Sequence, residues 1–193
     1  MERVYCAGIA TPIGRIWVAA TEAGLFQIDF PRPRAAFLDS IRRRIDAEIV
    51  HDPDRFDALG EMFEDYFNGE RVDYDLPFDL RGTDFQKAVW RGIHEIPYGR
   101  LSSYGRLAAR IGRPRAARAV GNACGANPLA IVIPCHRVVR SDGSIGGFGG
   151  SPELKRYLLN LEGVLPGAEG GGPRPLEREY PRTREDLLRF FFE

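Results

Sequence analysis

The sequence predicts an α+β protein, in which a small N-terminal domain of antiparallel sheet and helices precedes a mainly helical domain. Apolar β-branched runs lie near the N-terminus, helical spacing of apolar residues dominates residues 81–163, and Gly and Pro cluster after residue 163. A chain of 193 residues can bury the cores of two small domains. We therefore expect domains at 1–80 and 81–163, followed at 164–193 by a Gly/Pro linker and a helical tail.

Residues 1–80 begin with strands and continue with helices. Apolar, β-branched runs predict three strands, at residues 4–7, 16–21 and 25–30. Apolar residues at helical spacing predict one helix over residues 35–49 and another from about Phe56 to Asn68, where Gly69 stops it. No residue pattern in this half carries chemistry, so we expect it to support the rest of the chain.

The second half is predicted to contain a helix-turn-helix. Thr83 and Gln86 have the spacing of a capping box at the start of one helix. A second helix is expected after Ser103, which caps it, and Gly112 closes it. A third helix is expected over residues 115–125. Two short helices joined by a turn with glycine are typical of this DNA-binding motif.

The third helix consists largely of Ala and Gly, with Arg115 and Arg118 projecting between them. Such a helix could lie in a narrow groove, where Arg118 could reach between bases, although close packing of two helices through alanines is the alternative. Residues 1–80 hold 9 Arg and 16 Asp or Glu, whereas residues 81–163 hold 13 Lys or Arg and 5 Asp or Glu. A basic half suggests a polyanionic partner, and a solvated surface is the alternative.

The three cysteines, Cys6, Cys124 and Cys135, are too widely spaced for a disulfide framework or a zinc site. The three histidines do not cluster with them. No apolar run approaches 18 residues, and the N-terminus has no signal-peptide pattern. We therefore expect a soluble intracellular protein, cytoplasmic or nucleoid-associated, whose thiols stay reduced.

The run from Ile131 to Val139, Ile-Val-Ile-Pro-Cys-His-Arg-Val-Val, concentrates the chemistry of the chain. Its β-branched start predicts a short buried strand that Pro134 must end. Cys135 would then lie at the end of a strand beside His136, which can favour the nucleophilic thiolate. The alternative is a small buried hydrophobic cysteine next to a surface histidine.

Together with several flanking runs, this motif resembles the O6-alkylguanine-DNA alkyltransferases. The flanking runs are Gly82–Gln86, Pro97–Gly99, Ala117–Gly121, Phe148–Gly150 and Leu158–Gly163. The resemblance is strong over residues 83–163 and extends to residues 1–80 only as an order of elements. It implies that residues 81–163 form the DNA-binding and catalytic domain of a repair protein. Such a protein flips O6-alkylguanine out of duplex DNA and transfers the alkyl group irreversibly to its own cysteine, in a single turnover.

The resemblance implies a catalytic role for five residues of this chain. Cys135 matches the cysteine that accepts the alkyl group, and His136 matches the base that removes the thiol proton through a water. Glu162 matches the carboxylate that orients this histidine. Asn127 matches the residue that holds the turn of the cysteine. Tyr104 matches the hydroxyl that protonates the departing guanine and crowds the phosphate.

The resemblance also implies the DNA contacts and the pocket. Arg118 matches the finger that fills the space left by the flipped base, and Arg137 is expected to support the turn of the cysteine. The expected DNA contacts are Ser103, Tyr104, Arg115, Arg118, Ala119 and Gly121. The expected pocket wall is Val138, Val139, Gly146, Phe148 and Gly149. Gly149 stands where the family often has Ser, which leaves its backbone amide as the donor to the base.

The expected partner is alkylated double-stranded DNA, bound by a monomer without a cofactor, a metal or a membrane. A helix-turn-helix protein without enzymatic activity would need a dimerisation element, and none is obvious before residue 80. A sensor of alkylation lesions would lack the cysteine, and a cysteine hydrolase would need an oxyanion hole that the sequence does not indicate. For the tail, apolar residues after Thr183 predict a helix that docks on the same molecule, and a frayed terminus or docking on a second copy is the alternative. The choice among O6-methylguanine, O4-methylthymine and bulkier adducts stays open, as does the preference for single or double strands.

Overall fold

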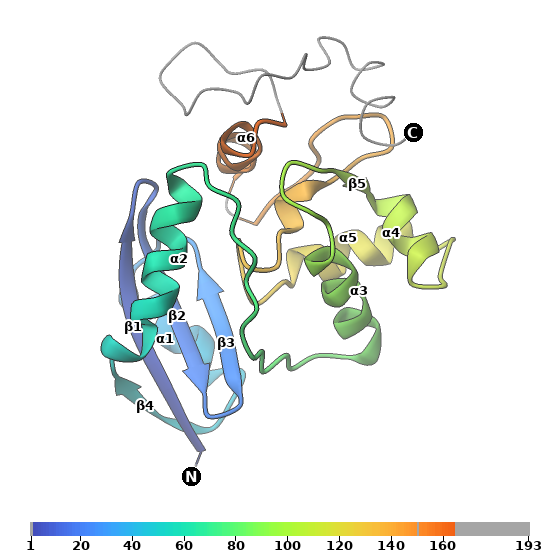
Figure 1. Ribbon diagram of the computed structural model, residues 1–193. Coiled ribbons are helices and arrows are strands. Elements are labelled where there is room, and N and C mark those ends of the chain that lie inside the picture. Colours follow the sequence, from blue (N-terminus) through green and yellow to red (C-terminus); the bar gives the residue numbers. More distant parts are fainter. Residues whose placement is uncertain (1, 150, 165–193) are drawn as a thin grey trace. The chain divides into compact units, whose positions relative to one another are not determined.

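The computed structural model describes residues 2–149 and 151–164, which divide into two compact units (Figure 1). The first unit contains the chain up to Arg81 together with Pro128–Ala130. The second contains Gly82–Asn127 and the chain from Ile131 onward. The helix predicted after Thr183 lies outside the described residues.

The first unit is built on a four-stranded sheet with the strand order β3-β2-β1-β4. The strands are β1 (Glu2–Thr11), β2 (Gly14–Thr21), β3 (Gly24–Asp29) and β4 (Ala47–His51). β1, β2 and β3 form an antiparallel meander, whereas β4 pairs in parallel with β1. The predicted α+β class and its predicted antiparallel sheet are therefore confirmed, with one parallel edge strand in addition.

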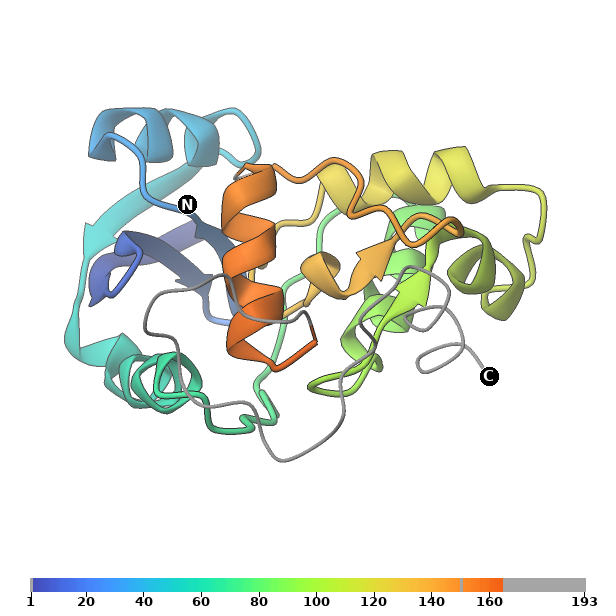
Figure 2. The ribbon, with the colours of Figure 1, turned by 90° about the horizontal axis from the view of Figure 1, so that it is seen from above.

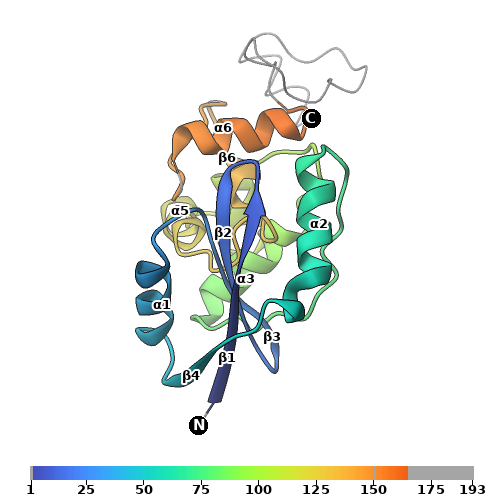
Figure 3. The same ribbon diagram turned by 90° about the vertical axis from the view of Figure 1, so that its left-hand side faces the viewer.

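Two helices, α1 (Arg34–Arg42) and α2 (Asp57–Phe67), cover opposite faces of this sheet (Figure 2; Figure 3). On one face, Phe37 and Ile41 of α1 pack with buried apolar residues of β1, β2 and β3. On α2, Phe63 and Phe67 are buried at helical spacing. Each such side chain contributes about 1.5–3 kcal/mol by its burial, so the sheet unit is held together by apolar packing.

The helix predicted over residues 35–49 is wrong in its second half. α1 ends at Arg42, and residues 47–51 instead form β4, which pairs with the edge of β1. Ile45 continues the helical spacing and is buried, but it lies in the connection. Strand pairing with β1 overrides the helical pattern, because β-branched residues such as Ile49 and Val50 favour a strand.

A short segment between the later helices returns to the sheet unit. The backbone N–H of Ile28 in β3 donates to the carbonyl of Pro128 over 2.7 Å, and Ile28 forms a parallel bridge with Leu129. Leu129 is fully buried. No pattern in the sequence predicts this return, since a single bridge carries no periodicity.

The second unit is mainly helical, as predicted. Its helices are α3 (Asp84–His94), α4 (Tyr104–Arg110), α5 (Ala117–Gly125) and α6 (Pro152–Leu161). The capping box of α3 is present, with the Gln86 N–H donating to Thr83 Oγ1 over 3.2 Å and the Thr83 N–H donating to Gln86 Oε1 over 2.9 Å. Ser103 caps α4, and Gly112 follows that helix with a φ of 72°. α5 begins two residues later than predicted, because a hydrogen bond from the Ala116 N–H to the Arg113 carbonyl closes a turn there.

The strand predicted over residues 131–133 is absent, although all three residues are buried. Ile131 has a φ of 71°, a conformation that β-branched residues rarely adopt and that turns the chain. Cys135 then begins a 3-10 turn, Cys135–Arg137, and its N–H donates to the Ile133 carbonyl over 2.8 Å. Extended pairing resumes only at β6 (Val138–Val139), parallel to β5 (Ser102–Ser103). The cysteine therefore lies on a tight turn rather than at the end of a strand.

Candidate active site

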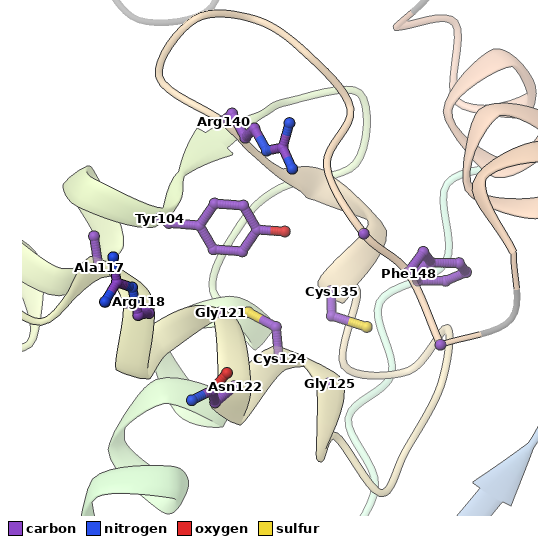
Figure 4. A pocket seen from close by; sticks show the side chains of 12 residues that line it. Tyr104, Ala117, Arg118, Gly121, Asn122, Cys124, Gly125, Cys135, Arg140 and Phe148 are labelled. Carbon is purple, nitrogen blue, oxygen red and sulfur yellow. The ribbon is translucent and has the colours of Figure 1, made fainter.

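Cys135 lines a cavity of about 760 Å³ formed within the second unit (Figure 4). Helix α5 forms one wall, and Arg140 together with Gly147, Phe148 and Gly149 forms another. The lining residues are Tyr104, Ala117, Arg118, Gly121, Asn122, Cys124, Gly125, Cys135, Arg140, Gly147, Phe148 and Gly149. A cavity of this size can enclose a nucleobase together with a substituent.

A buried charge cluster lies directly behind the cysteine. The His136 Nε2–H donates to Glu162 Oε1 over 2.6 Å, and both side chains are completely buried. Arg137 donates to the same carboxylate through Nε over 2.8 Å and through Nη2 over 3.1 Å. Because a carboxylate can only accept, the Glu162 contact assigns the ring hydrogen of His136 to Nε2 and leaves Nδ1 as the basic nitrogen.

Electrostatics hold this cluster in one protonation state. Burial alone would raise the pKa of Glu162, but His136 and the Arg137 guanidinium lower it to about 2. Burial lowers the pKa of His136, against the opposing attraction of Glu162. The histidine is therefore neutral near pH 7, and Arg137 keeps the carboxylate ionised. A neutral imidazole held by a carboxylate is the form that can accept a proton.

Asn127 links the turn of the cysteine to the end of α5. Its Nδ2 donates to the Ile133 carbonyl over 2.7 Å and to Cys135 Sγ over 3.2 Å. Burial raises the pKa of the Cys135 thiol, whereas the bond from Asn127 and the charge of Lys155 lower it. The resting cysteine is therefore a thiol, and it needs a base to become a nucleophile.

Lys155 is a site residue that the sequence analysis missed. It lies on α6 with its side chain completely buried, and its Nζ donates to the Val138 carbonyl over 2.6 Å. The same nitrogen lies 5.9 Å from the centroid of the Phe148 ring. Burial lowers the pKa of Lys155 to about 8, although Cys135 and Cys124 oppose this. A lysine at a helix position facing the core is the sequence signal that could have indicated it.

Of the predicted pocket wall, Phe148 and Gly149 line the cavity, but Val138 and Val139 are buried in β6 and do not. Gly146 lies close to Tyr104. A Cβ atom added to Gly146 would lie 3.1 Å from the Tyr104 hydroxyl, so glycine leaves room for that side chain. Its φ of 75° also favours glycine there. Burial raises the pKa of Tyr104 to about 12, so its hydroxyl stays protonated near neutral pH.

Of the predicted DNA contacts, Arg118 and Gly121 line the cavity from α5. Arg115 precedes α5 and Ala119 lies on it, and both are exposed. Ser103 is buried, and its hydroxyl accepts from the Arg106 N–H over 3.1 Å, which occupies it as a helix cap. In the described part of the chain no group of His, Cys, Asp or Glu could hold a metal ion, and no helix is long and apolar enough to cross a membrane.

Two family models match this chain. Residues 84–164 match the DNA-binding domain of 6-O-methylguanine DNA methyltransferase, and residues 4–80 match its ribonuclease-like domain. The methylated-DNA–protein-cysteine methyltransferase of Methanosarcina barkeri is 42% identical over 159 residues, which are 82% of this chain and 97% of that protein. The Haemophilus influenzae protein of the same name is 39% identical over 85% of this chain and 89% of its own length.

The fold is similar to that of solved structures of the same kind. The crystal structure of Mycobacterium tuberculosis OGT in complex with DNA has a TM-score of 0.71 and 39% identity. The match covers 83% of this chain and 92% of that one. A structure of the O6-methylguanine methyltransferase of the same organism has a TM-score of 0.70 and 38% identity, over 84% of this chain and 93% of that one.

Proposed function

The chain belongs to the 6-O-methylguanine DNA methyltransferase family, and we propose that Cys135 accepts the alkyl group in a single-turnover repair reaction. It is an enzyme that repairs DNA by transferring an alkyl group to its own cysteine. The observation that carries the assignment of Cys135 is the neighbouring cluster of buried charge. Arg137 fixes the Glu162 carboxylate, and Glu162 fixes the proton of His136.

The reaction begins with activation of the thiol. His136 Nδ1 takes the proton of Cys135 through a bridging water, and Glu162 stabilises the imidazolium that forms. The bond from Asn127 and the nearby ammonium of Lys155 stabilise the thiolate, because both favour its charged form. Because His136 is neutral before the reaction, moving one proton from the Cys135 thiol to His136 leaves the net charge of the site unchanged.

Alkyl transfer is an in-line displacement at the alkyl carbon. The sulfur–carbon bond forms while the bond from that carbon to guanine O6 breaks, and the electron pair passes to the guanine. Tyr104, whose hydroxyl is protonated near neutral pH, donates a proton to the leaving base, and the proton that His136 took from the thiol restores the Tyr104 hydroxyl through solvent. The product thioether is a poor leaving group, so each chain reacts once.

The target base must leave the duplex to reach Cys135, which is about nine-tenths buried. We propose that α5 lies against the DNA with its small residues close to the backbone. Arg118 then fills the gap that the flipped base leaves. The first unit serves as a support, and the protein acts as a monomer on alkylated double-stranded DNA in the cytoplasm or at the nucleoid, without a metal or cofactor.

Mapping the alkyl group tests this proposal. The chain is incubated with a duplex that contains one O6-methylguanine, digested, and analysed by peptide mass spectrometry. One methyl group on the peptide of Cys135, and unmodified guanine in the duplex, are expected. Loss of methyl from the DNA without a methylated cysteine would contradict the assignment, as would tight binding without transfer.

A further inference from the structure

Within the described part of the chain, the cavity around Cys135 is lined by two charged side chains, and both are cationic. Arg118 projects from α5, whereas Arg140 follows β6 on the other side of the cavity, with Tyr104 between them (Figure 4). Among the described residues that line the cavity, none is acidic. The entrance is therefore positive from two directions, which favours an anion there.

The backbone of Arg140 is held in a defined position. Its N–H donates to the Ser144 carbonyl over 3.0 Å, and its own carbonyl accepts from the Gly143 N–H over 3.0 Å. The nearby Asp142 carboxylate accepts from the N–H and the hydroxyl of Ser144, over 2.9 and 2.6 Å. Because β6 immediately precedes it, Arg140 is carried by a closed turn at the end of a buried strand.

The charge of Arg140 is not neutralised within the described residues. Arg137 and Arg110 each form an ion pair with a carboxylate, whereas no ion pair among the described residues involves Arg140. Arg140 is exposed. Its field reaches the reacting groups. Burial, Cys124 and Cys135 raise the pKa of Tyr104, and Arg140 opposes this rise.

We propose that Arg140 binds a phosphate flanking the extruded nucleotide, and so holds that nucleotide over Cys135. This inference rests on the proposed function, in which the base enters the cavity and its sugar and phosphates remain at the entrance. Arg118 is committed to the gap in the duplex, so it cannot also neutralise the flipped backbone. A guanidinium can meet a phosphate with two parallel hydrogen bonds, which fixes orientation as well as charge.

Arg140 acts here as a positioning residue, and its loss should slow repair of the duplex. The single-turnover rate of methyl transfer is expected to fall about 10- to 100-fold in Arg140→Ala, the equivalent of one lost charge-assisted hydrogen bond. The slope of log binding constant against log salt should become shallower by about one. Arg140→Lys should restore part of the rate, because lysine restores the positive charge but cannot donate two parallel hydrogen bonds to the phosphate.

A neutral phosphate provides the decisive comparison. Duplexes are made in which one or the other phosphate beside O6-methylguanine is a methylphosphonate, and each is tested with the native chain and with Arg140→Ala. At one position, the two changes together should slow transfer no more than either alone. Arg43→Ala, which removes an exposed arginine of the first unit, is the matched control. Any effect of Arg43→Ala on the transfer rate should be independent of the effect of the methylphosphonate at either position.

Two results would overturn the inference. Independent effects of Arg140→Ala and the methylphosphonate at both positions would mean that the guanidinium touches neither phosphate. An unchanged rate in Arg140→Ala would mean that it holds nothing. Failure of the native chain to take up methyl from the unmodified duplex would instead overturn the proposed function, which makes the two failures distinguishable.

Discussion

The two units of this protein differ in what they bury. Among the described residues, the buried polar side chains of the sheet unit are Thr21 and Gln27. Within the same described residues, the helical unit buries Ser103 and four side chains of the basic and acidic types, which are His136, Arg137, Lys155 and Glu162, in addition to the Cys135 thiol. Burying an ion pair often costs as much free energy as it returns, so such a cluster is weak support for stability. The difference indicates that the helical unit accepts this cost for chemistry, and that apolar packing stabilises the sheet unit.

Removing the sulfur should give the largest change in activity. Cys135→Ser is expected to lower methyl transfer by at least about 1,000-fold, because His136 cannot make an alkoxide as it makes a thiolate. Binding to methylated duplex should stay within about threefold, since the hydroxyl removes no DNA contact. Transfer assays and fluorescence anisotropy measure the two quantities. A serine variant that repairs at a comparable rate would refute the thiolate mechanism.

Breaking the buried cluster should affect both stability and activity. Glu162→Gln leaves the Arg137 guanidinium without its carboxylate, so we expect unfolding to become about 3–5 kcal/mol easier and transfer to be nearly lost. Phe37→Ala in the sheet unit should cost a similar 3–5 kcal/mol through a cavity. Denaturant titration and transfer rates, at a temperature where both variants are folded, compare the two. Equal loss of transfer in both variants would show that the cluster has no chemical role.

Lys155→Met should change the pH dependence of the reaction rather than abolish it. The ammonium lowers the pKa of the Cys135 thiol, so its removal should raise that pKa and move the rising limb of the rate–pH profile to higher pH. Near neutral pH we expect a loss of about tenfold. An unshifted profile with a uniformly lower rate would mean that Lys155 only supports the Val138 carbonyl.

Acid should produce the smallest of these effects. The folded pKa of Glu162, about 2, lies below its ordinary value of 4.5, so its contribution to stability is complete above the ordinary value. It should be lost as pH falls from about 5 towards 2. Thermal unfolding of Glu162→Gln should therefore depend less on pH in that range than unfolding of the native chain. Parallel curves would place the acid sensitivity elsewhere.

The sequence predicted much of the helical unit because local chemistry determines it. The Thr83–Gln86 capping box and the closure of α4 at Gly112 follow from rules that act within a few residues. The predictions from the sequence were wrong where contacts between residues far apart in the chain determine the local structure. β4 at Ala47–His51 depends on the edge of β1, and the left-handed turn at Ile131 contradicts the preference of its own residue type.

The candidate site shows the same division. The Cys135–His136 pair is adjacent in the sequence, and Glu162 was proposed only through the resemblance to a family. The structure brings His136 and Glu162 within 2.6 Å, although 26 positions separate them. Lys155 and Arg140 were missed, because a charged residue in a helix or at a turn is usually solvated. Arg140 reaches the cavity through the turn that follows Cys135, whereas Lys155 reaches the Val138 carbonyl because α6 buries its side chain.

Counting the methyl groups that each chain accepts is the most direct test of single-turnover transfer to Cys135. The native chain is mixed with a large excess of duplex containing labelled O6-methylguanine, and protein-bound methyl is followed until it stops rising. We expect a plateau at one methyl group per chain, reached by the native protein and absent in Cys135→Ser. Continued release of methyl groups beyond one per chain, or a plateau retained by the serine variant, would contradict it.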